Sequence, residues 1–88
     1  AAEIGMINRV VPADRLLSEA NDLAGKLAAG PTASIARVKR MLNATFSNDL
    51  PQQLSLEAAC QIESGQSLDF KEGVAAFFEK RQPRFGGK

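Results

Sequence analysis

The chain has 88 residues, a formal net charge of +1, no histidine and one cysteine. The lack of histidine excludes Ser-His-Asp and Cys-His catalytic sites and any zinc site that needs imidazole ligands, and a single cysteine excludes an internal disulfide framework and favours a reducing, intracellular setting. At this length we expect one domain at most, and no apolar run approaches the roughly 20 residues that a membrane-spanning helix needs.

The first segment, residues 1–12, is predicted to be a strand or an extended segment. Its apolar residues form a short run that ends at Pro12: Ile4, Met6, Ile7, Val10 and Val11. A solitary strand cannot satisfy its own backbone donors and acceptors. We therefore expect a sheet partner, either in an N-terminal part that precedes this chain or in a second copy.

Two helical patterns follow Pro12, and they are separated by Gly30 and Pro31, the usual punctuation between helices. The first carries an apolar face made by Leu16, Ala20, Leu23, Ala24, Leu27 and Ala28. The second is predicted to turn inward Ile35, Val38, Leu42 and Phe46. Its cations Arg37 and Arg40 are then expected on the opposite side of the helix.

A third helical pattern begins at Pro51 and ends near Gly65. Cys60 lies within it among apolar neighbours, and no cation adjoins it in sequence. We therefore predict a small buried hydrophobic residue at this position rather than a reactive thiol.

A fourth helix is predicted next, capped by Asp69 with Glu72 reaching back, or alternatively by Ser67. A basic tail, residues 83–88, follows it, and its last few residues are predicted to be disordered. Residues 1–79 hold seven Lys or Arg against ten Asp or Glu, whereas four cations and no anions follow: Lys80, Arg81, Arg84 and Lys88. This cluster could bind a phosphate or an acidic partner. Alternatively, it is a solvated helix end whose cations complement the helix dipole. Nucleic-acid binding is disfavoured because no helix carries a basic stripe.

The fourth helix also suggests a binding surface. At about 100° per residue, one sector holds Phe70, Val74, Phe77 and Phe78. A second, shallow sector places Gly73, Ala76 and Lys80 beside Phe77, so a flat heteroaromatic group could approach the small residues while its phosphates meet the Lys80 ammonium. The alternative is that Phe77 belongs to the core and Gly73 marks a close helix contact.

The order of these features resembles the enoyl-CoA hydratase/isomerase, or crotonase, family over nearly the whole chain. The resemblance rests on the run from Ile4 to Pro12, the Leu/Ala helix that ends at Gly30 and Pro31, Lys39, and a final group made by Asp69, Phe70, Glu72, Gly73, Ala76, Phe77, Glu79, Lys80, Arg81, Pro83 and Phe85. It implies a mainly α fold class, with about four helices after a short N-terminal strand, as the C-terminal helical part of a crotonase fold. Residues 1–12 would end a missing N-terminal spiral domain, residues 13–82 would form a helical segment for oligomerisation and coenzyme A covering, and residues 83–88 a basic tail.

The resemblance also implies a function for this segment. The parent protein would hydrate or isomerise a 2-enoyl-CoA, and Phe77 and Lys80 would contact the adenine and phosphate end of the acyl-CoA substrate. No residue of the chain matches a catalytic position, so the chain alone is predicted to be inactive, with coenzyme A present only as part of the substrate and no tightly bound cofactor or metal.

The expected partners are the acyl-CoA, the missing N-terminal domain and further copies in a trimer or hexamer, without nucleic acid or membrane. The expected location is the cytoplasm, or the mitochondrial matrix of a eukaryote. The alternative is a stand-alone helical protein-interaction module without catalysis.

Overall fold

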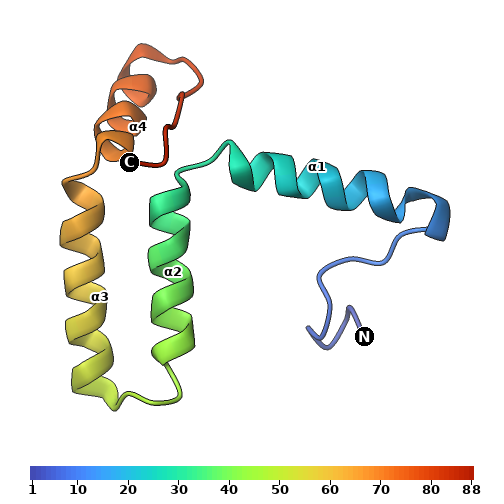
Figure 1. The fold of residues 1–88 in the computed structure, drawn as a ribbon, viewed down its shortest axis with the longest axis horizontal. Coiled ribbons are helices and arrows are strands. Elements are labelled where there is room, and N and C mark those ends of the chain that lie inside the picture. Colours follow the sequence, from blue (N-terminus) through green and yellow to red (C-terminus); the bar gives the residue numbers. More distant parts are fainter.

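The computed structural model describes residues 1–88 as a chain of helices without a strand. The elements, in chain order, are the 3-10 turn η1 (Ala13–Arg15) and the α-helices α1 (Leu16–Ala28), α2 (Thr32–Ala44), α3 (Leu50–Gly65) and α4 (Leu68–Glu79). In Figure 1, α2 and α3 lie side by side as an antiparallel hairpin, α4 crosses above its open end, and α1 extends away from it. None of these helices combines the length and the apolar composition that crossing a membrane would require.

The predicted N-terminal strand is wrong. Residues 2–8 form turns and bends and residues 9–12 have no regular structure; the amide of Gly5 donates to the Ala2 carbonyl at 3.2 Å and that of Met6 to the Ala1 carbonyl at 3.0 Å. Gly5 has a φ of 78°, a left-handed conformation that glycine adopts without steric cost. The chain supplies no second strand, so its backbone groups close local turns instead of a sheet ladder.

Helix α1 confirms the first helical prediction, since it begins soon after Pro12 and ends just before Gly30 and Pro31. Its apolar side chains nevertheless remain open to solvent, and no residue of α1 is buried. Leu16 is 62% exposed and Leu27 is 51% exposed. The apolar face is therefore formed but not covered.

The α2–α3 hairpin is joined mainly by polar contacts. Arg37 Nε lies 3.1 Å from Glu63 Oε2, and Arg40 Nη2 lies 3.5 Å from Glu63 Oε1. These ion pairs lower the pKa of the Glu63 carboxyl, first through the hydrogen bond from Arg37 and then through the charge of Arg40. The predicted orientation of α2 is therefore wrong: the arginines face α3, while Leu42 and Phe46 are exposed.

Helix α3 begins at a complete capping box. Asp49 accepts a hydrogen bond from the Gln52 amide at 2.9 Å, and the Gln52 side chain accepts one from the Asp49 amide at 2.9 Å. Pro51 stands in the first turn, where its missing N–H costs nothing. The start and end of α3 agree with the prediction for residues 51 to 65.

The chain is extended rather than compact. It exposes 7250 Å² of surface, whereas a compact monomer of this size exposes roughly 5,000 Å². Its radius of gyration is 16.5 Å, against about 12 Å for a compact domain of this length. Only Cys60, Asp69 and Ala76 are buried, so most apolar side chains need a cover from outside these residues.

We expect the isolated 88 residues to self-associate, because apolar side chains of α1, α2 and α4 are all open to solvent. Multi-angle light scattering over a concentration series should give a mass that rises with concentration. Leu23→Ser together with Leu27→Ser, on the open face of α1, should lower that mass at equal concentration. A monodisperse monomer at the highest concentration would contradict the expectation.

Candidate functional site

Helix α4 begins at Ser67, whose Oγ accepts a hydrogen bond from the Phe70 amide at 3.0 Å. The second of the two predicted caps is thus the correct one, and the cap at Asp69 is wrong. Asp69 is instead 5% exposed and binds the other end of the chain. A buried carboxylate requires hydrogen-bond donors, and residues 86 and 87 supply them.

The C-terminal strap, defined here as residues 81–88, folds back along α4. The amide of Gly86 donates to Asp69 Oδ1 at 2.7 Å, and the amide of Gly87 donates to Asp69 Oδ2 at 2.8 Å. The Asp69 amide in turn donates to the Lys88 carbonyl at 2.9 Å. The predicted disorder of the last residues is therefore wrong, because three hydrogen bonds anchor them.

Gly87 is required by this arrangement for two reasons. Its φ is 76°, and a Cβ atom at this position would lie 2.5 Å from Thr32 Oγ1. We expect Gly87→Ala to destabilise the anchored strap by about 1 to 3 kcal/mol, through backbone strain and this contact. Backbone amide exchange at residues 86–88 of the complete protein should speed up accordingly, whereas Gly86→Ala, which meets open space, should have a smaller effect; equal exchange in both variants would contradict the prediction.

Lys80 forms the turn between α4 and the strap. Its φ of 54° is left-handed, and the amide of Arg81 reaches back to the Ala76 carbonyl at 3.0 Å while that of Lys80 contacts the Phe77 carbonyl at 3.3 Å. These are the two bonds of a Schellman motif, which usually has glycine at the left-handed position. A lysine therefore occupies a position where a side chain costs conformational energy, and its ammonium lies at the negative end of the helix dipole.

A second carboxylate, that of Glu72, holds the middle of the strap. Arg81 binds it with both terminal nitrogens, Nη1 to Oε1 at 2.6 Å and Nη2 to Oε2 at 3.1 Å, and the Arg84 amide donates to Oε1 at 2.8 Å. The Arg81 hydrogen bonds, followed by that of the Arg84 amide, lower the pKa of Glu72 to about 2. The pKa of Arg81 is raised, first by Glu72 and then by Glu79.

These shifts predict that acid releases the strap. The pKa of Glu72 is lower in the folded chain, so its stabilising contribution is complete above the ordinary value of 4.5 and is lost as the pH falls towards about 2. Amide proton signals of residues 81–85, followed by NMR between pH 6 and pH 2, should shift in this window. In Glu72→Gln these amide signals should no longer shift between pH 6 and pH 2. Signals that still shift in this variant would show that another group titrates.

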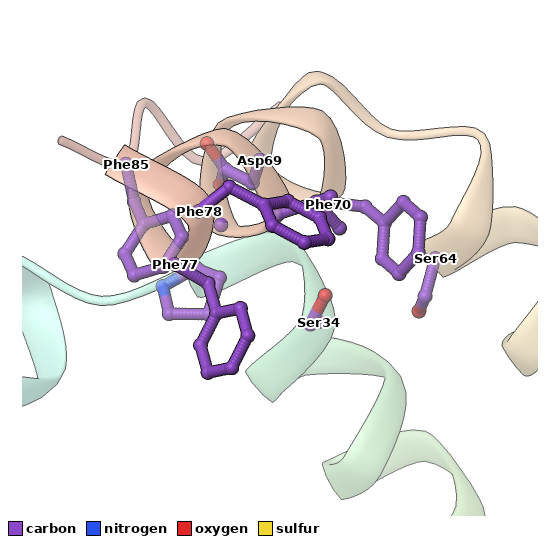
Figure 2. A pocket seen from close by; sticks show the side chains of 10 residues that line it. Ser34, Ser64, Asp69, Phe70, Phe77, Phe78 and Phe85 are labelled. Atoms are coloured by element: carbon purple, nitrogen blue, oxygen red, sulfur yellow. The ribbon is translucent and has the colours of Figure 1, made fainter. Parts of the chain in front are cut away.

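The strap closes one side of an aromatic groove, an open cavity of about 440 Å³ (Figure 2). Four phenylalanines and six other residues line the groove: Phe70, Phe77, Phe78, Phe85, Pro31, Ser34, Ser64, Asp69, Gly73 and Val74. The rings of Phe77 and Phe78 meet edge to face, with centroids 5.7 Å apart. The groove therefore offers aromatic faces and edges to a ligand.

The structure brings the two predicted contact residues to one end of α4. Phe77 is 78% exposed, which excludes the alternative that it belongs to the core of these residues. Lys80 is exposed three positions later and takes part in none of the ion pairs of the structure. A ligand with an aromatic ring and a phosphate could meet both side chains.

The predicted strip of small residues is not open. Ala76 is 1% exposed, and the Phe85 ring lies 3.6 Å from the position that a Cβ of Gly73 would take. Sequence reasoning missed Phe85 as part of the site. The glycine pair that follows it was the only available signal, because glycines permit a close approach of the backbone.

Cys60 is buried, at 2% exposed, as predicted. Its sulfur accepts a hydrogen bond from Arg40 Nη2 at 3.1 Å, a contact that raises the pKa of the arginine. The sequence interpretation missed this cation because it comes from α2, twenty positions earlier in the chain. Cys60 thus has a polar partner as well as a packing role.

The fold, the groove and the sequence together define the class of protein. All of residues 1–88 match the family described as Enoyl-CoA hydratase/isomerase, and the chain belongs to that family. It is 49% identical over its whole length to a probable enoyl-CoA hydratase of Rhodobacter capsulatus and 43% identical to a 1,2-epoxyphenylacetyl-CoA isomerase of Escherichia coli, and covers 34% of each. A crystal structure of a putative enoyl-CoA hydratase/isomerase from Mycobacterium abscessus superposes with a TM-score of 0.94 at 36% identity, over 100% of this chain and 34% of that one.

These comparisons confirm the family and correct two further predictions. The chain spans about a third of the length of the relatives that it matches. The predicted fold class, a strand and four helices at the C-terminal end of a crotonase fold, is wrong for this structure, which has four helices and no strand. The predicted function of a C-terminal helical segment is likewise corrected: the matches support the reaction class of the parent protein and not that placement within it.

Proposed function

We propose that the protein containing these residues acts on the double bond of a 2-enoyl-CoA thioester, by hydration or isomerisation. The observation that carries the proposal is the family match over all 88 residues. The name of one relative, a probable enoyl-CoA hydratase, agrees with hydration, and that of another, a 1,2-epoxyphenylacetyl-CoA isomerase, agrees with a CoA thioester as the substrate. In such a reaction the developing thioester oxyanion needs hydrogen-bond donors and the protons need carboxylates to move them, and the coenzyme A is part of the substrate rather than a resident cofactor.

We propose further that Phe77 and Lys80 contact the coenzyme A part of the substrate. The adenine would lie against the exposed Phe77 ring, and the Lys80 ammonium would pair with a phosphate. The exposure of both side chains and the absence of an ion pair at Lys80 support this assignment. The neighbouring Arg81 is less available, because Glu72 and Glu79 hold its guanidinium.

The uncovered apolar surface supports two further partners. We propose that the rest of the parent protein covers part of it, and that copies associate as a trimer or hexamer through the remainder. The bacterial relatives and a mitochondrial one from Dictyostelium discoideum support a cytoplasmic or matrix location. No observation favours a stand-alone interaction module.

The direct test is turnover of crotonyl-CoA by the complete protein. Loss of the conjugated enoyl thioester absorbance in the ultraviolet would report hydration, and product analysis by mass spectrometry would separate addition of water from an isomer of equal mass. The absence of activity in both assays, with crotonyl-CoA and with longer 2-enoyl-CoA substrates, would contradict the proposal.

A further inference from the structure

The Phe85 ring is fixed by hydrogen bonds on both sides of its own residue. The amide before it, that of Arg84, donates to Glu72 Oε1 at 2.8 Å, and the amide after it, that of Gly86, donates to Asp69 Oδ1 at 2.7 Å. Both acceptors are carboxylates of α4, one turn apart. The backbone position of Phe85 is therefore determined by side chains of the helix that it covers.

Asp69 is the more buried of these two anchors. Its carboxylate is buried and each of its oxygens accepts a different backbone amide, whereas Glu72 is shared among Arg81 and the Arg84 amide. Hydrogen bonds to a charged acceptor are about twice as strong as neutral ones. An aspartate is seldom buried without such partners, so the site is built around this contact.

The anchored strap shapes the groove that holds Phe77. Phe85 lies over Gly73 and lines the same cavity as Phe77, as Figure 2 shows for the labelled rings. Without the Asp69 contact, the Phe85 ring would leave Gly73 uncovered and the groove would lose one wall.

We infer that Asp69 is a positioning residue for the coenzyme A contact: it holds Phe85 as a wall of the aromatic groove and thereby sets the affinity for coenzyme A without touching it. This inference rests on the proposed contact of Phe77 and Lys80 with the substrate. It predicts a role in ligand affinity for a buried residue that does not itself contact the ligand.

The test compares Asp69→Asn with the unchanged complete protein. An amide keeps the size of the side chain but turns an NH2 donor towards an amide that also donates, so one hydrogen bond is lost. Amide exchange at Gly86 and Gly87 should accelerate at least about tenfold, and the Kd for coenzyme A itself, measured by calorimetry, should rise by about three- to tenfold. The kcat with crotonyl-CoA should stay unchanged while KM rises.

Two further variants keep the test decisive. Phe85→Ala leaves both anchors in place and should raise the Kd for coenzyme A by a similar factor, even if Asp69→Asn does not fold. Asp49→Ala removes the cap of α3, away from the groove, and should lower the melting temperature without changing the Kd.

The inference is overturned if Asp69→Asn leaves the exchange of Gly86 and Gly87 unchanged, or if the exchange accelerates while the Kd for coenzyme A stays the same. If the affinity for coenzyme A falls in Lys80→Ala but not in Asp69→Asn or Phe85→Ala, only the positioning role of Asp69 is contradicted. If Lys80→Ala and Phe77→Ala also leave the affinity for coenzyme A unchanged, both the proposed contact and this inference are contradicted.

Discussion

The isolated 88 residues are expected to show no turnover of crotonyl-CoA above the uncatalysed rate, whereas the complete protein is expected to turn it over. Enzymatic acceleration is typically a millionfold or more, so the expected difference is the largest among these predictions. The carboxylates with defined contacts are occupied. Glu19, Glu63, Glu72 and Glu79 are paired with arginines, Asp49 caps α3, and Asp69 holds the strap. The aromatic groove is open to water, which weakens the electrostatic stabilisation of a developing oxyanion.

The measurement is a spectrophotometric assay at micromolar concentrations of the purified chain, with the complete protein as the positive control. A trace of host hydratase would mimic activity, so the assay is repeated on Phe77→Ala of the same isolated chain. Turnover that persists through repeated purification and changes with this substitution would contradict the prediction and assign chemistry to these residues.

Lys80→Ala in the complete protein should raise KM for the acyl-CoA by roughly 5- to 150-fold, because a charge contact to a phosphate contributes about 1 to 3 kcal/mol. The kcat should change little, since the proposed contact is with the coenzyme A part of the substrate and would be made equally in the ground state and the transition state. The matched control is Lys71→Ala, which removes an exposed lysine from the first turn of the same helix.

The left-handed backbone at Lys80 permits a sharper comparison. Lys80→Gly removes the ammonium but relieves the strained conformation, so it should stabilise the end of α4 by about 1 kcal/mol while raising KM as Lys80→Ala does. Phe77→Ala should also raise KM, whereas Phe46→Ala, which removes a fully exposed phenylalanine of the α2–α3 connection, should not. A KM that is unchanged in both Lys80 variants would make Lys80 a solvated residue at the helix end.

Helix boundaries could be predicted from the sequence because their signals are local. Gly30 and Pro31 separate α1 from α2, and Pro51 lies in the first turn of α3, as expected. The strand prediction for residues 1–12 failed because an apolar run does not reveal whether a partner strand exists. The predicted inward face of α2 is wrong, because an apolar stripe does not reveal which neighbour a helix meets, and Arg37 bonds to Glu63 of α3.

The site was predictable only in its helical part. Phe77 lies in the last turn of α4 and Lys80 directly follows the helix, so their common place at its end follows from their closeness in sequence. The role of Asp69 depends on Gly86, seventeen residues later, and no local pattern connects them. The helix-cap interpretation of Asp69 was reasonable for its position but lost to this distant contact, because two backbone amides satisfy a buried carboxylate better than one.

The α2–α3 hairpin reverses the usual distribution of charged and apolar side chains. Arg37 and Arg40 meet Glu63 between the helices, while leucine and phenylalanine side chains point outwards. Sodium chloride screens the exposed ion pairs, whereas a strongly hydrated salt such as sulfate favours burial of apolar surface. A rise in ionic strength should therefore weaken the contact between α2 and α3. The choice of anion should set how strongly the exposed apolar side chains of the hairpin bind the surface that covers them.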